Sequence, residues 1–163
     1  MTYNINQFNL LQKTSNPSTQ TLSTTFTEIN GSKGSLDFSR DTSTFLYKCS
    51  FYAETKYIDS SNNFPPFMHI KLQKSNDNFS SNIEDIPNCI VNFSGETAQS
   101  NDYYYKVCNI MFIVENLDSQ YKHLRLTTRA YSSSWNNNLH TTALFGEGSV
   151  AIFYEPVLEI IEI

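Results

Sequence analysis

Apolar side chains recur at every second position along most of this chain, and helical spacing does not persist over any full window. In residues 44–53 they share one side of a strand: Phe45, Tyr47, Cys49, Phe51 and Ala53. The same period recurs in residues 68–73, 89–93, 124–130 and 150–154. Without a helix to cover a sheet, two sheets must cover each other. The pattern therefore predicts an all-β, antiparallel β-sandwich, and within that class a jelly roll of about eight strands.

The segment of residues 103–114 differs from the others because both of its sides are apolar. One side carries Tyr103, Tyr105, Val107, Met111 and Ile113, and the other carries Cys108, Ile110 and Phe112. Strands that are apolar on both sides are typical of positions buried on both faces. We therefore expect this strand to lie centrally, with cover on each face.

The chain has 163 residues, which predicts one domain with a substantial core. Residues 1–24 are rich in Thr, Ser, Asn and Gln, and they predict either a polar N-terminal arm or an ordinary edge strand with a loop. Residues 25–155 form the predicted sandwich. Residues 156–163 are largely apolar and predict a C-terminal tail or one more edge strand.

Charge and targeting signals limit the classes of partner. Charged residues make up 17% of the chain and the net charge is -5, which argues against a nucleic-acid partner because phosphate binding needs clustered Lys and Arg. The first residues resemble no secretory signal, and no apolar run is long enough for a membrane span. Cys49, Cys89 and Cys108 lie in apolar runs, which predicts buried free thiols and assembly in a reducing cytosol.

Catalytic and metal-binding signatures are not recognisable in the sequence. His69, His123 and His140 are far apart and lack a zinc-ligand spacing. The carboxylate pair Glu84 and Asp85 falls in a predicted loop, where the burial that raises the pKa of a catalytic acid is not expected. We therefore predict no enzyme activity, no catalytic residues, no metal and no cofactor.

One loop has the composition of a carbohydrate-binding surface. Aromatic rings stack on sugar faces, and neutral amides hydrogen-bond to sugar hydroxyls. The candidates are Tyr131, Trp135, Asn136 and Asn137. The alternative is that Trp135 covers one end of the sandwich.

The succession of strands resembles that of trimeric jelly-roll heads. The segments that carry this resemblance are residues 45–53, 103–114, 124–129 and 148–154. They look like tumour-necrosis-factor-like and complement-globular-head-like modules, which also occur in viral fibre and minor capsid proteins. In such trimers aromatic residues of the inner strands pack about the threefold axis. The resemblance points to Tyr103, Tyr105, Phe112 and Tyr154 for that role, and it implies no catalytic residues.

The apolar tail offers further candidates for contacts between subunits. Val157, Leu158, Ile160 and Ile161 would be costly to leave in water. Together these features predict a non-enzymatic structural subunit of a virus or virus-like particle, of the minor capsid, penton or fibre-head type. We expect a homo-oligomer, a trimer by resemblance, that contacts other capsid proteins in a virion assembled in the host cytoplasm. The alternative is a carbohydrate-binding module or a receptor-binding, lectin-like domain.

Overall fold

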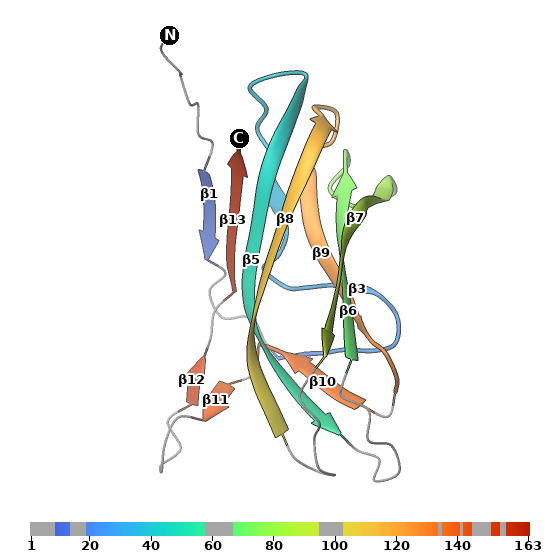
Figure 1. Cartoon of the computed structure of the whole chain (residues 1–163), viewed down its shortest axis with the longest axis vertical. Helices are drawn as coiled ribbons and strands as arrows, with labels where there is room; N and C mark the ends of the chain where they lie inside the picture. The colour runs from blue at the N-terminus through green and yellow to red at the C-terminus, as the bar shows by residue number, and fades with distance from the viewer. Residues whose placement is uncertain are drawn as a thin grey trace.

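The computed structural model describes residues 9–13, 19–57, 67–94, 103–133, 135–140, 142–144, 151–153 and 156–163. Its regular elements are β-strands that form two packed layers (Figure 1). The antiparallel β-sandwich predicted from the alternation is confirmed. Eight of the described strands have five or more residues: β1, β5, β6, β7, β8, β9, β10 and β13.

The six-stranded sheet is built around β5, a strand of 16 residues. Its members are β1 (Asn9–Lys13), β2 (Gln20–Thr21), β5 (Thr42–Tyr57), β8 (Tyr103–Asp118), β10 (Trp135–Leu139) and β13 (Val157–Glu162). Along one side of β5, β13 pairs with the first half of the strand and β10 pairs with the second half. The other side of β5 pairs with β8 over nearly its whole length.

The five-stranded sheet has β6 and β9 at its centre and β7 at one edge. Its members are β3 (Thr27–Glu28), β4 (Gly34–Ser35), β6 (Phe67–Ser75), β7 (Ile83–Ser94) and β9 (His123–Ala130). A separate pair, β11 (Thr142–Leu144) and β12 (Ala151–Phe153), completes the described strands. The chain changes sheet between β5 and β6, between β7 and β8, and between β8 and β9, an alternation typical of jelly-roll sandwiches.

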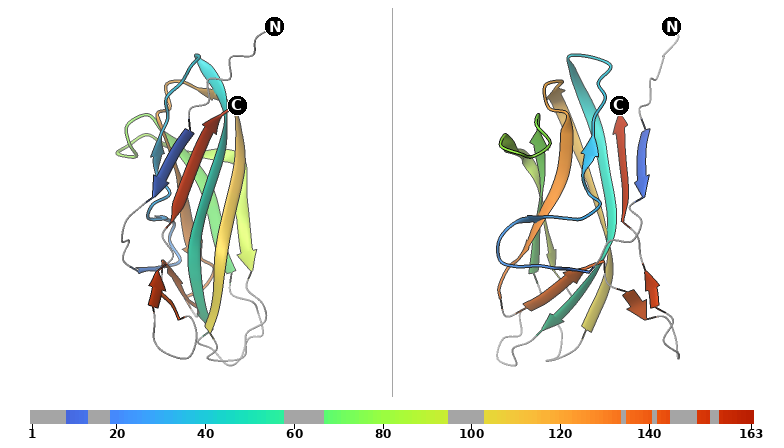
Figure 2. Two further views of the ribbon diagram at one scale, coloured as in Figure 1. Left: turned by 90° about the vertical axis from the view of Figure 1, so that its left-hand side faces the viewer. Right: turned by 180° about the vertical axis from the view of Figure 1, so that it is seen from behind.

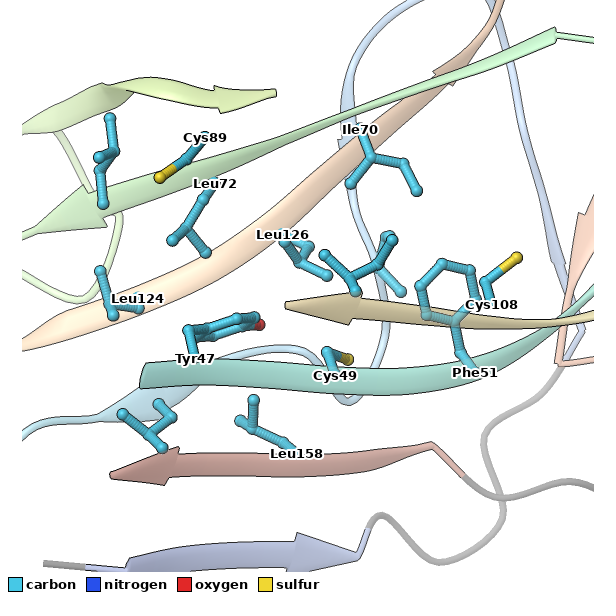
Figure 3. Packing of buried hydrophobic residues seen from close by; sticks show 14 of the residues in the cluster. Tyr47, Cys49, Phe51, Ile70, Leu72, Cys89, Cys108, Leu124, Leu126 and Leu158 are labelled. Carbon is cyan, nitrogen blue, oxygen red and sulfur yellow. The ribbon is translucent and has the colours of Figure 1, made fainter. Parts of the chain in front are cut away.

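The core lies between the two sheets, and alternate residues of β5, β6 and β9 point into it (Figure 3). The largest side chains that are fully buried are Phe45, Tyr47, Phe51, Ile29, Ile70, Leu72, Leu124, Leu126, Leu139, Leu158 and Ile160. The Tyr47 hydroxyl donates a hydrogen bond to the carbonyl of Ser32, which satisfies the one polar atom that this ring brings into the core. Cys49, Cys89 and Cys108 are free and buried, as predicted.

The described residues near the N-terminus belong to the sandwich. β1 pairs with β13, and β2 pairs with β10. Leu22 is buried in the core, and its N–H donates to the carbonyl of Asn137. Residues 9–13 and 19–24 therefore behave as strands and loop rather than as a free arm, whereas residues 1–8 and 14–18 lie outside the described part of the chain.

The C-terminal segment is an internal strand of the six-stranded sheet. β13 pairs with β5 on one side and with β1 on the other, so neither an edge strand nor a free tail describes it. Its last residue, Glu162, accepts hydrogen bonds from the Ser43 hydroxyl and from the Ser39 hydroxyl and N–H. Burial alone would raise the pKa of this carboxyl, but the hydrogen bonds from Ser43 and Ser39 outweigh it and the pKa is lowered.

His140 is a buried titratable group that follows β10. Its side chain is 1% exposed, and its ring lies edge-on to Phe51 with 6.3 Å between centroids. Burial disfavours the imidazolium and lowers the pKa of His140 to about 4. The folded chain therefore keeps this ring neutral at pH values where an unfolded chain protonates it.

We expect the protein to lose stability between pH 6.5 and pH 4 because of His140. Over this range the unfolded chain binds a proton that the folded chain excludes, so the free energy of unfolding falls with pH by about 3 kcal/mol. Urea unfolding at a series of pH values measures the slope, and His140→Gln serves as the control that lacks the titrating group. Equal slopes for the two proteins between pH 6.5 and pH 4 would contradict this assignment.

Candidate functional site

Four of the eight large hydrophobic side chains that are exposed among the described residues lie on the outer side of β8. Met111 is 65% exposed and Ile113 is 56% exposed, while Tyr105 and Val107 are also exposed. The alternate residues Cys108, Ile110 and Val114 point into the core, and they form the buried side of the same strand.

The prediction that this strand is central and covered on both faces is wrong. β8 pairs with β5, and among the described strands no other one pairs with it, so it forms the edge of its sheet. The core covers one face of β8, and the other face is exposed. Alternation identifies the two apolar sides, but it carries no information on strand order or on whether both sides are covered.

Neighbouring strands extend this apolar surface across the sheet. Residues directly opposite each other in an antiparallel pair point to the same face. Register places Leu46 between Ile113 and Ile161, and it places Tyr52 beside Val107. We call the resulting surface the apolar face, and its members are Leu46, Tyr52, Tyr105, Val107, Met111, Ile113, Val157 and Ile161. In the left panel of Figure 2 its strands β13, β5 and β8 lie side by side toward the viewer.

Two contacts organise the interior of the apolar face. Tyr52 and Tyr105 stack with 6.0 Å between ring centroids and an interplanar angle of 14°. Lys48 and Glu159 form an ion pair with 2.8 Å between Nζ and Oε2. This ion pair lies in the row of Met111, and its two charges cancel. The middle of the face is therefore polar but locally neutral, and the apolar residues lie on either side of this ion pair.

The outer face of the five-stranded sheet has the opposite character. Lys71 pairs with Asp85 at 2.7 Å, and Arg125 pairs with Glu28 at 3.0 Å. The Lys71 Nζ also lies 4.3 Å from the centroid of the Phe26 ring, so its charge has both a carboxylate and an aromatic partner. Such a surface is well suited to water. Among the described residues, the outer face of the five-stranded sheet is thus richer in ion pairs, and the row of exposed apolar residues lies on the six-stranded sheet.

The residues proposed from sequence for subunit contacts fall into two groups. Tyr105, Val157 and Ile161 lie on the apolar face. Leu158 and Ile160 are fully buried in the chain's own core, so their assignment to an interface between subunits is wrong. The physical reason is the period of two, which turns these residues toward the core when Val157 and Ile161 face outward.

The three remaining candidates have different outcomes. Phe112 is on the core side of β8 and packs against the buried cluster, so its assignment to a subunit interface is not supported by its position. Tyr103 begins β8, and Tyr154 lies outside the described residues. The members of the face that the sequence left unassigned are Leu46, Tyr52, Val107, Met111 and Ile113. The second apolar side of residues 103–114 was the signal that could have identified the last three.

The residues proposed for sugar binding do not form one platform. Tyr131 is exposed, and its ring lies edge-on to His69 with 5.8 Å between centroids. Asn136 is exposed, and Trp135 begins β10 opposite Tyr57. Asn137 is 3% exposed and shares the inward side of β10 with Leu139, so its assignment to sugar contact is wrong. Glycan binding through Tyr131, Trp135 and Asn136 stays a prediction.

The described residues were also inspected for reactive groups. Within them no three His, Cys, Asp or Glu side chains gather as metal ligands would. Burial raises the pKa of both the Cys49 and the Cys108 thiol to about 12, which disfavours the nucleophilic thiolate. Asp77 accepts hydrogen bonds from Ser75, Ser81 and the Asn82 N–H, and its carboxylate closes the turn between β6 and β7.

The apolar face is thus a candidate interaction surface in the described structure. In the described part of the chain, no helix has the length and apolarity that crossing a bilayer requires. No protein-family model and no curated protein matches this sequence.

Proposed function

We propose that this chain is a non-enzymatic structural subunit that assembles with copies of itself through the apolar face. The observation that carries the proposal is β8, a strand with two apolar sides of which the described chain covers one. Contiguous exposed apolar surface on a soluble protein marks an interaction site. In this proposal, a neighbouring molecule covers the outer apolar side of β8.

A second copy suits this face as the neighbour. The ion pair of Lys48 with Glu159 leaves the centre of the face neutral, so two such faces meet without repulsion between like charges. Aromatic residues and Met are enriched at protein interfaces, and the face exposes Tyr105 and Met111. Full burial of one large apolar side chain contributes roughly 1.5–3 kcal/mol. Partial burial of several such side chains on each copy therefore supports a stable contact.

We further propose that the assembly is a virus or virus-like particle, with the chain as a minor capsid, penton or fibre-head component. The support is the β-sandwich, which is the common unit of such particles, together with the resemblance to trimeric jelly-roll heads. The resemblance makes the trimer the expected state, other capsid proteins the expected further partners, and a virion assembled in the host cytoplasm the expected location.

The direct test is the molar mass of the purified full chain by light scattering over a wide concentration range. We expect an oligomer, with the trimer as the state that the resemblance implies. A monomer over the whole range would overturn self-assembly. An oligomer of another size would support self-assembly but would contradict the prediction of a trimer.

A further inference from the structure

Arg129 adds an unbalanced positive charge to the outer face of the five-stranded sheet. It lies near the end of β9, directly opposite His69 of β6, while its sequence neighbour Ala130 points into the core. Lys71 and Arg125 on the same face form ion pairs at 2.7 Å and 3.0 Å. Within the described part of the chain, no carboxylate forms an ion pair with Arg129. A ligand therefore has to supply the anion if this charge is to be paired.

Two contacts hold the Arg129 guanidinium in a defined orientation. Its Nε donates a hydrogen bond to Nδ1 of His69 at 3.2 Å, and its Cζ lies 4.9 Å from the centroid of the Phe26 ring. Neither contact is a hydrogen bond from the two Nη groups, and no described residue accepts one from them. A guanidinium that is held in place with its Nη edge unpaired is suited to the two oxygens of a carboxylate.

The charge of this site matches a ligand with a single negative charge. Burial lowers the pKa of His69, and the positive charge of Arg129 lowers it further, so the imidazole stays neutral beside the guanidinium. The carboxylates of Glu28 and Asp85 lie on the same face, and the whole chain has a net charge of -5. A polyanion requires clustered cations, which this arrangement does not provide. The site therefore favours an isolated carboxylate.

An exposed aromatic ring lies next to this cation. Tyr131 directly follows β9 and is 62% exposed, and its ring lies edge-on to His69 with 5.8 Å between centroids. Asn92 of β7 lies opposite His69 on the other side, where it adds an exposed neutral amide to the same row. Aromatic rings stack on the apolar faces of sugars, and amides hydrogen-bond to sugar hydroxyls. The row thus brings together the groups that recognise a sugar and the group that recognises a carboxylate.

We infer that Arg129, Tyr131 and Asn92 form a surface site for a carboxylated sugar, such as a uronic acid. Arg129 binds the carboxylate, Tyr131 stacks on the sugar ring, and Asn92 hydrogen-bonds to a hydroxyl. Of the residues predicted from sequence for sugar binding, this site uses Tyr131 alone. The inference goes beyond the proposed self-assembly and does not depend on it, because the site lies on the five-stranded sheet and the apolar face lies on the other.

Saturation-transfer NMR with the full chain tests which ligand chemistry is recognised. The main probe is methyl glucuronide. Its methyl ester keeps the ring and removes the charge, acetate keeps the carboxylate alone, and a sulfated methyl glucoside exchanges one anion for another. We expect the Kd of methyl glucuronide to be about tenfold lower than that of each of the other three. If any of them bound as tightly as the glucuronide, the assignment to a carboxylated sugar would be overturned.

Three variants test the residues. Arg129→Gln removes the guanidinium and is expected to raise the Kd of methyl glucuronide about tenfold. Tyr131→Ala removes an exposed ring, so folding is not at risk, and it is expected to raise the Kd about threefold. Lys122→Gln is the matched control, because Lys122 is also an unpaired cation beside an aromatic ring, with 5.1 Å from Nζ to the centroid of Phe38. It should leave the Kd unchanged.

The outcomes separate this site from the proposed self-assembly. An unchanged Kd in Arg129→Gln or in Tyr131→Ala, or an equal rise in Lys122→Gln, would overturn the sugar site. Urea unfolding shows whether Arg129→Gln is folded, and light scattering should give this variant the same molar mass as wild type. Loss of sugar binding with an intact oligomer supports a site that is distinct from the apolar face.

Discussion

Replacing both Met111 and Ile113 by lysine is expected to dissociate the oligomer, with an increase in Kd on the order of 100-fold. Both side chains are on the outer side of β8 and are its most exposed apolar residues. In an assembly through the apolar face, the two ammonium groups would lose water without gaining a partner, which is strongly unfavourable. The measurement is sedimentation velocity or light scattering of wild type and variant at matched concentrations.

The control for this prediction is Ile90→Lys, which adds a cation at a similarly exposed apolar position on β7. It should leave the oligomer intact because β7 belongs to the five-stranded sheet and lies outside the apolar face. Folding of the double variant is checked by its near-UV circular dichroism, since both substituted side chains are already in water in the single chain. Retention of the wild-type oligomer by a folded double variant would rule out the apolar face as the interface.

Leu158→Ala is expected to lower the free energy of unfolding by about 2–5 kcal/mol, the range for removing a fully buried leucine. Leu158 is 0% exposed, and it packs in the shared core beneath β5 (Figure 3). The truncation leaves a cavity because β13 is held in place by β1 on one side and β5 on the other. Urea unfolding measures the loss.

The measurement is best made in the dissociated background of Met111→Lys with Ile113→Lys, so that assembly adds nothing to the apparent stability. Ile161→Ala is the matched control on the opposite side of β13, where the side chain is half-buried on the apolar face. In this background we expect it to lose less than half as much stability as Leu158→Ala. If Leu158→Ala left the stability unchanged and weakened only the oligomer, residues 156–163 would be an interface segment after all.

The contrast between Leu158 and Ile161 shows what periodicity alone leaves open. Both residues are apolar members of one short strand, and their sequence neighbourhood is alike. Pairing of β13 with β5 orients Leu158 toward the core and Ile161 toward the apolar face. A shift of register by one residue would exchange the two roles. Strand pairing, and not composition, therefore determines which of the two residues faces the core.

Asn137 and His140 illustrate a second kind of information that is missing from the sequence. Polar residues in a loop-like segment are normally expected at the surface. Here β10 continues the six-stranded sheet beside β5, and this position buries both side chains. Their burial follows from a contact between segments about 80 residues apart, which no local pattern reports.

The sequence by itself determined the layered β architecture, the inward residues of the long strands and the buried free thiols, because these depend on local alternation and on the cost of exposing apolar side chains. Only the tertiary structure decided that β8 lies at an edge, that β13 lies inside the sheet, and which apolar side is left uncovered. Those outcomes depend on the order and register of strands that are distant in the chain. Their backbone hydrogen bonds look alike from one pairing to another, so the choice among pairings depends on how all the side chains pack together.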